Sequence, residues 1–398
     1  MPKKIISCVL ICILLFAFAS CGKKEKEEKH STELKLPDKK VAVLVAPESQ
    51  YPEDYRAAKA LEAKYPDNVI VKEYADSRVL VAGDAEIITL SKELAADETV
   101  GAVVYARATQ FAYTAIQRAK EINPSLVTVA VEPEQSLDYI YSVSDLVIMA
   151  DWMKYSRRIV DTAKDMGAEK FVLFSYDRHV SSNPLYSQLK KSIADECYNK
   201  RVEFIFENFK DPNYSGGADA AKYDIRQRIV NLFDTKQIEA GKTAVFSTDS
   251  IVQSVLVEQA AKRSLIYVSP SFPTAYNGIC EYYEAALPED IKDTASFISS
   301  LGSAISADTD GKGKFAIYNF ALADTLVRGA VYSAFDLLTG EADTENIFEK
   351  ASVRLKDASD NKKFNVDKYG PAPDGNVLMC YAPDYEIIKI EKMTEKSK

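Results

Sequence analysis

The sequence feature that most constrains the fold is a regular alternation of short apolar runs with longer amphipathic segments. Residues 41–45 and 100–105 are apolar at nearly every position, which is typical of strands buried on both faces of a parallel sheet. Residues 55–64, between two such runs, carry Ala57, Ala58 and Leu61 at helical spacing. Strand–helix alternation predicts an α/β fold whose parallel sheets are covered by helices on both faces.

The alternation runs through once and then restarts, so the 398 residues predict two Rossmann-like lobes rather than one. We assign residues 38–150 to an N-terminal lobe and 151–290 to a C-terminal lobe. Residues 291–398 are expected to return to the N-terminal lobe, where a long helix spans 321–338, and to end in a last strand at 385–390. Residues 356–375 are polar and predict a long surface loop. The expected strands of the two lobes are 41–45, 69–71, 100–105, 126–131 and 145–149, then 171–174, 202–206, 243–247 and 265–268.

The N-terminus carries the pattern of an export signal. Two lysines precede an apolar run over residues 5–19, which is short for a membrane-spanning helix and predicts a signal peptide over residues 1–20. The tetrapeptide Phe18-Ala19-Ser20-Cys21 resembles the bacterial lipobox, whose cysteine is acylated. This resemblance implies an exported lipoprotein that is anchored to a membrane by acyl chains on Cys21. Residues 21–37 are charged and predict a solvated tether.

Three cysteines remain beyond Cys21, namely Cys197, Cys280 and Cys380, and no CxxC or Cys/His spacing joins them. Zinc sites and disulfide scaffolds are therefore not expected, although one disulfide between two of the three stays open. Apolar neighbours favour buried thiols. We expect no bound metal and no cofactor.

The charge and the motifs exclude several classes of function. A net charge of −9 disfavours nucleic acid as a partner, because phosphate binding needs a basic surface. The sequence has no GxSxG, GxGxxG, P-loop or HExxH motif, so we do not expect an enzyme. Glu132 and Asp249 could in principle form a glycosidase pair, but sequence does not give the separation of the two carboxylates.

Three segments carry a family resemblance. They are residues 101–110 with 126–133, residues 244–256, and residues 315–319 with a helix that ends at Leu338-Thr339-Gly340. In this order they resemble type I periplasmic substrate-binding proteins, the fold of ribose-type sugar receptors, nucleoside-binding lipoproteins and the cores of LacI-type regulators. Residues 278–311 depart from the sugar-receptor pattern and resemble more closely a group of uncharacterised bacterial lipoproteins. The resemblance implies two lobes joined by a hinge, with a ligand between them.

Carried onto this chain, the resemblance places candidate ligand-binding residues after strands of the first lobe. Glu48 and Tyr51 follow the first strand, where the alternative is a solvated turn. Arg107 follows the third strand and either reaches the ligand or pairs with a surface carboxylate. Glu132 follows the fourth strand, where sugar receptors carry an aspartate that accepts hydrogen bonds from hydroxyl groups. Trp152, the only tryptophan, either stacks on a ligand ring or packs in the hinge.

The second lobe supplies the remaining candidates. Asp177 and Arg178 follow a strand, next to a histidine that we expect to be an ordinary loop residue. Asp249 matches the family's position between strand and helix, and helix capping is its alternative role. Ser271 and Asn319 lie at family positions where a cleft aspartate and an amide are usual.

The resemblance implies an extracytoplasmic solute-binding lipoprotein. Such a protein would capture a small polar ligand, a sugar or a nucleoside-like compound, and deliver it to an ABC permease. The alternative is a surface lipoprotein that senses a ligand or binds another protein without transport.

Overall fold

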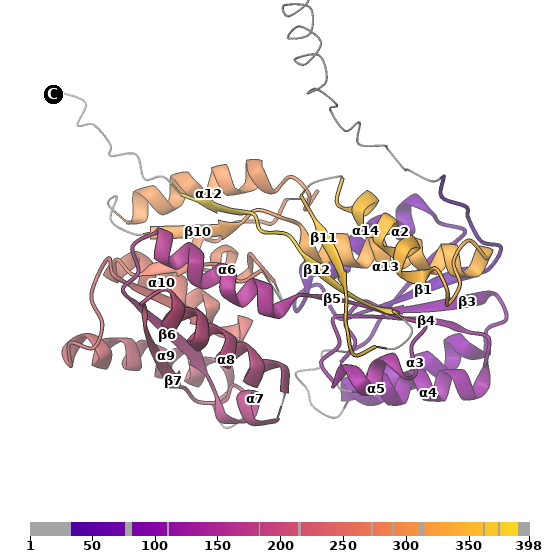
Figure 1. Cartoon of the computed structure of the whole chain (residues 1–398), viewed down its shortest axis with the longest axis horizontal. Helices are drawn as coiled ribbons and strands as arrows, with labels where there is room; N and C mark the ends of the chain where they lie inside the picture. Colours follow the sequence, from indigo (N-terminus) through magenta and orange to yellow (C-terminus); the bar gives the residue numbers. More distant parts are fainter. Residues whose placement is uncertain are drawn as a thin grey trace, which may run out of the picture. The chain divides into compact units, whose positions relative to one another are not determined.

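The computed structural model describes residues 33–75, 82–109, 111–182, 184–213, 216–271, 274–288, 290–309, 314–360, 363–372 and 375–388. The expected signal peptide and Cys21 lie outside these residues. The described chain forms two sheets with helices on both faces (Figure 1). No helix in the described ranges is both long enough and apolar enough to cross a membrane.

The first sheet has seven strands in the order β11-β12-β5-β4-β3-β1-β2, all parallel except β11. Its strands are β1 (Lys40–Val45), β2 (Val69–Glu73), β3 (Val100–Tyr105), β4 (Val127–Val131), β5 (Leu146–Ala150), β11 (Asn365–Lys368) and β12 (Val377–Tyr381). One face packs on α3 (Ala82–Ala96), α4 (Ala112–Ile122) and α5 (Leu137–Tyr141), and the other on α2 (Pro52–Lys64), α13 (Leu322–Thr339) and α14 (Ile347–Ala358) (Figure 1). We call this sheet and its helices the first lobe.

The second sheet has six strands in the order β13-β10-β9-β8-β6-β7, all parallel except β13. Its strands are β6 (Lys170–Ser175), β7 (Glu203–Asn208), β8 (Thr243–Ser247), β9 (Ile266–Val268), β10 (Lys314–Tyr318) and β13 (Tyr385–Ile387). Its helical elements are α6 (Trp152–Asp165), α7 (Asp177–Ser182), α8 (Pro184–Asn199), α9 (Gly217–Asp234), η1 (Ser250–Val252), α10 (Gln253–Arg263), α11 (Asn277–Tyr283) and α12 (Thr294–Asp308). We call this sheet and its helices the second lobe.

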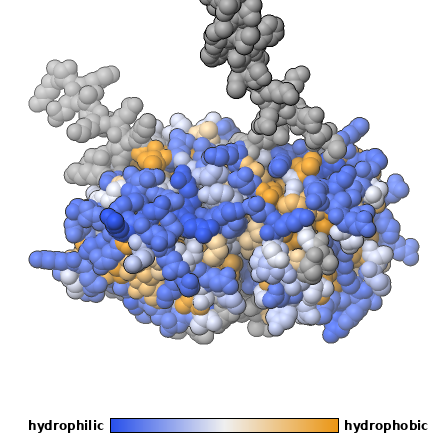
Figure 2. Space-filling model, in the orientation of Figure 1, coloured by the Kyte–Doolittle hydropathy of each residue, from blue (hydrophilic) through white to orange (hydrophobic). Residues whose placement is uncertain are grey.

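The apolar strands are buried on both faces, as their sequence predicts. In β1, Val41 and Val43 pack on the side of α2 and α13, whereas Ala42 and Leu44 pack on the side of α3 and α4. The period of two along a strand sends alternate side chains into two different cores. The surface seen in Figure 2 is largely hydrophilic, with small separate apolar patches. The three described cysteines are free thiols, and burial raises the pKa of each.

Residues 356–375, which we expected to be a surface loop, include the strand β11. This prediction was wrong because β11 is polar and mostly exposed. Among the described strands it pairs with β12 alone, at the edge of the sheet, so it lacks the apolar run of the inner strands. Residues 278–311, the segment that departs from the sugar-receptor pattern, include α12 and most of α11.

Three segments connect the two sheets, at residues 150–152, 318–322 and 381–385. Two tyrosines join them. The Tyr155 hydroxyl lies 2.8 Å from that of Tyr318 and accepts the Ala382 N–H at 3.0 Å, while the Tyr318 hydroxyl donates to the Ala382 carbonyl at 3.3 Å. One hydrogen-bonded unit therefore holds all three crossings.

Candidate functional site

Arg107 lies just beyond β3 and is the most deeply buried cation of the site, with 1% of its surface exposed. Its Nη2 donates to Asp54 Oδ2 at 2.5 Å, and its guanidinium lies 4.4 Å from the centre of the Tyr51 ring. Burial raises the pKa of Asp54, and Arg107 opposes that rise. Arg107 thus pairs with a buried carboxylate of α2, and not with a surface carboxylate.

Glu132 follows β4 and adopts a backbone φ of 48°, a conformation that residues other than glycine seldom adopt. Its side chain is 4% exposed, and its Oε1 accepts the Ala150 N–H at 2.7 Å, which links the ends of β4 and β5. Burial raises the pKa of Glu132 to about 8, although Arg107 and hydrogen bonds from Ala150 and Trp152 lower it. Glu132 is therefore mostly protonated at neutral pH.

Trp152 is the first residue of α6, directly after the first crossing between the sheets. Asp151 caps this helix by accepting the Lys154 N–H at 3.0 Å, which fixes where the helix begins. The Trp152 ring is 6% exposed and meets the Tyr186 ring of α8 edge-on, at 6.2 Å between centres. Trp152 is thus a core residue that also lies beside the site.

Asp249 follows β8 in the second lobe. Its Oδ1 accepts the Ile251 N–H at 2.9 Å, so it caps η1, and its Oδ2 accepts the Tyr176 hydroxyl at 3.0 Å. Burial raises the pKa of Asp249. The capping role expected from sequence is present, together with a second bond that the sequence did not indicate.

His179 lies between two tyrosines near Asp249. Its ring stacks on Tyr176 at 4.7 Å and lies 3.6 Å from the centre of the Tyr186 ring, and its Nδ1 is 3.1 Å from Thr248 Oγ1. Burial lowers its pKa to about 3, so the imidazole is neutral at physiological pH. His179 is therefore a neutral, partly buried ring of α7 that packs between two tyrosines and contacts Thr248, rather than an exposed loop histidine.

Ionisable groups of the two lobes influence one another's pKa values. Burial raises the pKa of Tyr51 above its ordinary value, and among the carboxylates that raise it further is Asp249 of the other lobe. The pKa of Tyr186 is raised by burial and by groups of the first lobe that include Tyr51. We name this region the strand-end cluster, which comprises Tyr51, Asp54, Arg107, Glu132, Trp152, Tyr176, His179, Tyr186 and Asp249.

Five of the ten ligand-binding candidates from sequence lie in the strand-end cluster and five lie outside it. Those outside it have local partners or are exposed. Glu48 pairs with Arg56 at 2.6 Å, and Arg178 pairs with Asp211 at 2.6 Å. Asp177 is exposed at the start of α7.

The last two candidates lie at a second contact between the lobes and at a crossing. Ser271 lines a small cavity together with Glu53 of α2, whose carboxylate accepts the Thr274 hydroxyl at 2.7 Å. Burial raises the pKa of Glu53 to about 7. The Asn319 side chain is engaged with Thr294 and Glu386.

Four members of the strand-end cluster were not among the candidates from sequence, namely Asp54, Tyr176, Tyr186 and His179, which we expected to be an ordinary loop residue. Asp54 lies one helical turn after Tyr51, and this spacing beside a candidate tyrosine was an available signal. Tyr176 directly precedes the candidate Asp177, so the strand end was identified but not the residue. Tyr186 lies in α8 and carries no signal in the sequence. Among the described residues no group of three or more His, Cys, Asp or Glu is arranged to hold a metal ion.

Comparisons with solved structures identify the fold. A protein described as a transcriptional regulator from Clostridium difficile has a TM-score of 0.69 at 14% identity, covering 89% of this chain and 100% of its own. A periplasmic ribose ABC transporter protein from Conexibacter woesei has a TM-score of 0.52 at 13% identity, covering 78% and 90%. A sugar ABC transporter protein from Actinomyces odontolyticus has a TM-score of 0.50 at 13% identity, covering 77% and 85%.

These likenesses confirm the predicted two-lobe α/β fold of type I periplasmic binding proteins, and at such identities they show the fold alone. A search of curated proteins gave no match. Residues 39–316 match the family described as "Protein of unknown function (DUF3798)". Because this match covers more than half of the sequence, the chain belongs to the DUF3798 family.

Proposed function

We propose that this protein is an extracytoplasmic solute-binding lipoprotein that captures a small polar ligand between its two lobes and delivers it to an ABC permease. The observation that carries the proposal is the strand-end cluster, where the carboxyl ends of β3, β4, β6 and β8 bring side chains of both lobes together. In parallel α/β sheets, ligands bind at the carboxyl ends of strands. Solved proteins with this fold include sugar ABC transporter proteins.

The charge of the cluster favours an uncharged ligand. Arg107 is paired with Asp54, and Glu132, with a pKa of about 8, is mostly protonated at neutral pH. A neutral ligand therefore meets no uncompensated charge at Arg107, Asp54 or Glu132, and the Asp249 carboxylate already accepts hydrogen bonds from Ile251 and Tyr176. The rings of Tyr51, Trp152 and Tyr186 add aromatic surface, which suits a sugar ring or a nucleobase. We infer a sugar or a nucleoside-like compound, bound without a catalytic step.

The membrane anchor belongs to the same proposal. Cys21 of the lipobox-like tetrapeptide is proposed to carry the acyl chains that hold the protein at the outer face of a bacterial membrane. Replacing Cys21 with serine should release the protein from the membrane fraction, whereas Cys280→Ser should leave it there. Membrane fractionation with labelled palmitate provides the measurement.

A thermal-shift screen of the protein against sugars, nucleosides, bases and amino acids tests the ligand class. A compound at 100 times its Kd should stabilise the fold by about 2.7 kcal/mol. A denaturation and refolding cycle before the screen removes any ligand carried through purification. A thermal shift with a sugar or a nucleoside supports the proposal. No thermal shift with any compound of the panel favours the alternative, a surface lipoprotein that binds another protein.

Two variants then locate the binding site. Trp152→Ala and Asp249→Asn should each weaken binding of the hit by about tenfold or more, and asparagine keeps a side-chain oxygen to cap η1. Asp195→Asn, an ion-paired and exposed residue of α8, is the matched control and should bind as the wild type does. If calorimetry shows unchanged affinity for both Trp152→Ala and Asp249→Asn, the ligand does not bind at the strand-end cluster.

A further inference from the structure

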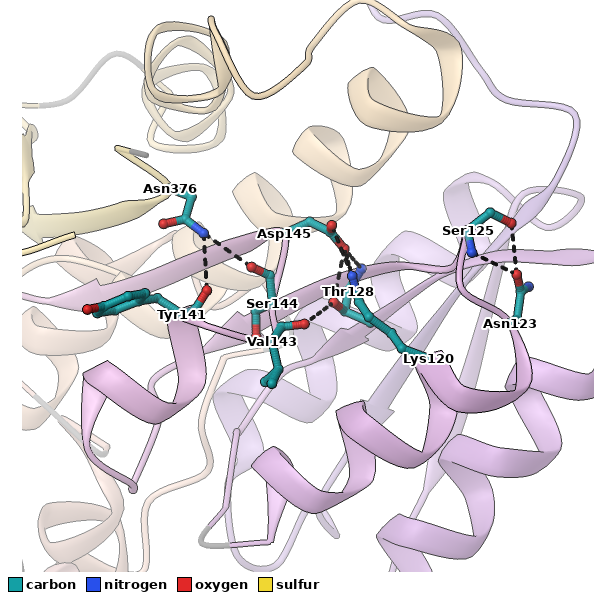
Figure 3. Close-up of polar contacts among 9 residues, drawn as sticks. All are labelled: Lys120, Asn123, Ser125, Thr128, Tyr141, Val143, Ser144, Asp145 and Asn376. Atoms are coloured by element: carbon teal, nitrogen blue, oxygen red, sulfur yellow. Dashed lines mark hydrogen bonds and ion pairs between the residues drawn. The ribbon is translucent and has the colours of Figure 1, made fainter. Parts of the chain in front are cut away.

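A hollow of about 810 Å³ lies at the amino ends of strands in the first sheet, whereas the strand-end cluster lies at their carboxyl ends. It is lined by the end of α4, the turn between α5 and β5, the connection between α13 and α14, and the residue that precedes β12 (Figure 3). Val127 opens β4 and Asp145 precedes β5, so the hollow lies at the amino ends of these strands. A strand of five residues spans on the order of 16 Å, which separates the hollow from Glu132 and Trp152.

Two buried polar atoms of the lining have no hydrogen-bond partner among the described residues. They are Ser144 Oγ and Asn376 Oδ1, in residues that are 5% and 8% exposed. The Asn376 amide nitrogen donates to the carbonyls of Ser144 at 3.1 Å and Tyr141 at 3.5 Å, which leaves its oxygen as the open acceptor (Figure 3). A buried polar atom without a hydrogen-bond partner is destabilising, so a bound molecule that supplies the missing hydrogen bond is favoured here.

The charged groups of the hollow are largely compensated. Lys120 Nζ contacts both oxygens of Asp145, at 3.0 and 2.9 Å, and Asp145 Oδ2 also accepts the N–H and the hydroxyl of Thr128 at 2.7 and 3.0 Å (Figure 3). Glu121 is paired with Arg118 at 2.8 Å, and Asp343, the third carboxylate of the lining, is exposed and accepts the N–H groups of Glu345 and Asn346 at 2.9 and 3.1 Å. An added anion would lie near carboxylates that are already satisfied, and an added cation would lie near Lys120.

The remaining chemistry fits hydroxyl groups. Lys120 has one N–H donor beyond its two contacts with Asp145, Ser144 has a hydroxyl that donates or accepts, and Asn376 has an open acceptor oxygen. A hydroxyl group both donates and accepts, so one small molecule with several hydroxyls satisfies this mixed set. The apolar lining, with Val143 and Leu337, suits the C–H faces of such a molecule.

We propose that this hollow is a second ligand site, which binds a small uncharged molecule with several hydroxyl groups, a polyol or a monosaccharide. The site is separate from the strand-end cluster and does not depend on the function proposed for it. Because Ser144 and Asp145 immediately precede β5, the site is built on a central strand of the first sheet rather than on a loose loop.

The test uses myo-inositol, D-glucose and D-ribose as probes of the full-length protein, with putrescine and inorganic phosphate as charged comparisons. Saturation-transfer NMR should detect binding of at least one hydroxylated probe. Thr344→Trp places a large ring on the exposed rim and should abolish that binding, whereas Glu345→Trp, one residue farther and not part of the lining, should leave it unchanged. Ser144→Ala should weaken binding about 5- to 10-fold.

Each other outcome overturns the proposal. No saturable binding of any hydroxylated probe means that water alone fills the hollow, and tighter binding of putrescine or phosphate means that the ligand class is wrong. Binding that is lost in Trp152→Ala but kept in Thr344→Trp belongs to the strand-end cluster instead. Amide exchange of the wild type gives a readout independent of any variant, since a bound probe should slow exchange in residues 141–145.

Discussion

Replacing Glu132 with glutamine should make the stability of the protein less dependent on pH. Burial raises the pKa of this carboxyl to about 8 in the folded protein, compared with 4.5 for the ordinary group. Glutamine has nearly the same size and keeps an oxygen that accepts the Ala150 N–H. The substitution therefore removes ionisation while keeping the geometry, including the backbone conformation of residue 132.

The sign of the effect follows from the direction of the pKa shift. The folded state binds the Glu132 proton more tightly than the unfolded state, so the stability from this group is fully present below pH 4.5. It is lost as the pH rises from about 4.5 to about 8. The difference between the two pKa values corresponds to about 5 kcal/mol in the free energy of unfolding across this window.

Urea unfolding of the wild type and of Glu132→Gln at pH 4.5, 7 and 9 measures this contribution. The variant should gain stability relative to the wild type as the pH rises, by several kcal/mol between pH 4.5 and 9. Glu98→Gln, at an exposed turn, is the control and should show no such gain. A difference between Glu132→Gln and wild type that is the same at all three pH values would refute the assignment of a buried, protonated Glu132.

Three further predictions concern the same region. Arg107→Met should reduce the free energy of unfolding by about 3–5 kcal/mol, because it leaves Asp54 buried without its cation. Adding Asp54→Asn should restore part of the loss, which a double-mutant cycle measured by urea unfolding tests. Tyr155→Phe should lower the free energy of unfolding by about 1–3 kcal/mol, since the crossings between the sheets lose the two hydrogen bonds of the Tyr155 hydroxyl. An unchanged thermal midpoint would contradict a stabilising role for these two bonds. Affinity for an uncharged ligand of the strand-end cluster should fall above pH 8 in the wild type but not in Glu132→Gln, because ionised Glu132 loses the O–H donor of its carboxyl group whereas glutamine keeps an N–H donor. Calorimetry from pH 6 to 9 measures this.

Most inner strands could be predicted from sequence because each is apolar along its whole length, but β12, which is also apolar and inner, was not among the expected strands. β1, β3 and β8 coincide with expected strands to within one residue at each end. The edge strand β11 could not be predicted in this way, since Asn365 and Asp367 are solvated and its pairing with β12 depends on residues beyond the segment itself. Apolar patterning reports burial, and β11 is mostly exposed.

The position of a residue after a strand was predictable, but its partner was not. Arg178 and Arg107 both follow strands, yet Arg178 pairs with Asp211 at a partly exposed position whereas Arg107 is buried against Asp54. The difference lies in the packing of α2 over the strand ends, which depends on tertiary structure. That any of these residues contacts a ligand stays a prediction.

Trp152 shows why sequence left two roles open for one residue. The ring belongs to the core under α6, directly after a crossing between the sheets, and it also meets Tyr186 inside the strand-end cluster. Glu132 joins these two environments, because its carboxyl accepts the Ala150 N–H at the crossing and lies close enough to Arg107 for the guanidinium to lower its pKa. Since the first crossing starts at the strand end that carries the site, hinge packing and ligand contact are not exclusive at residue 152. A change in the angle between the lobes would act directly on the groups proposed to hold the ligand.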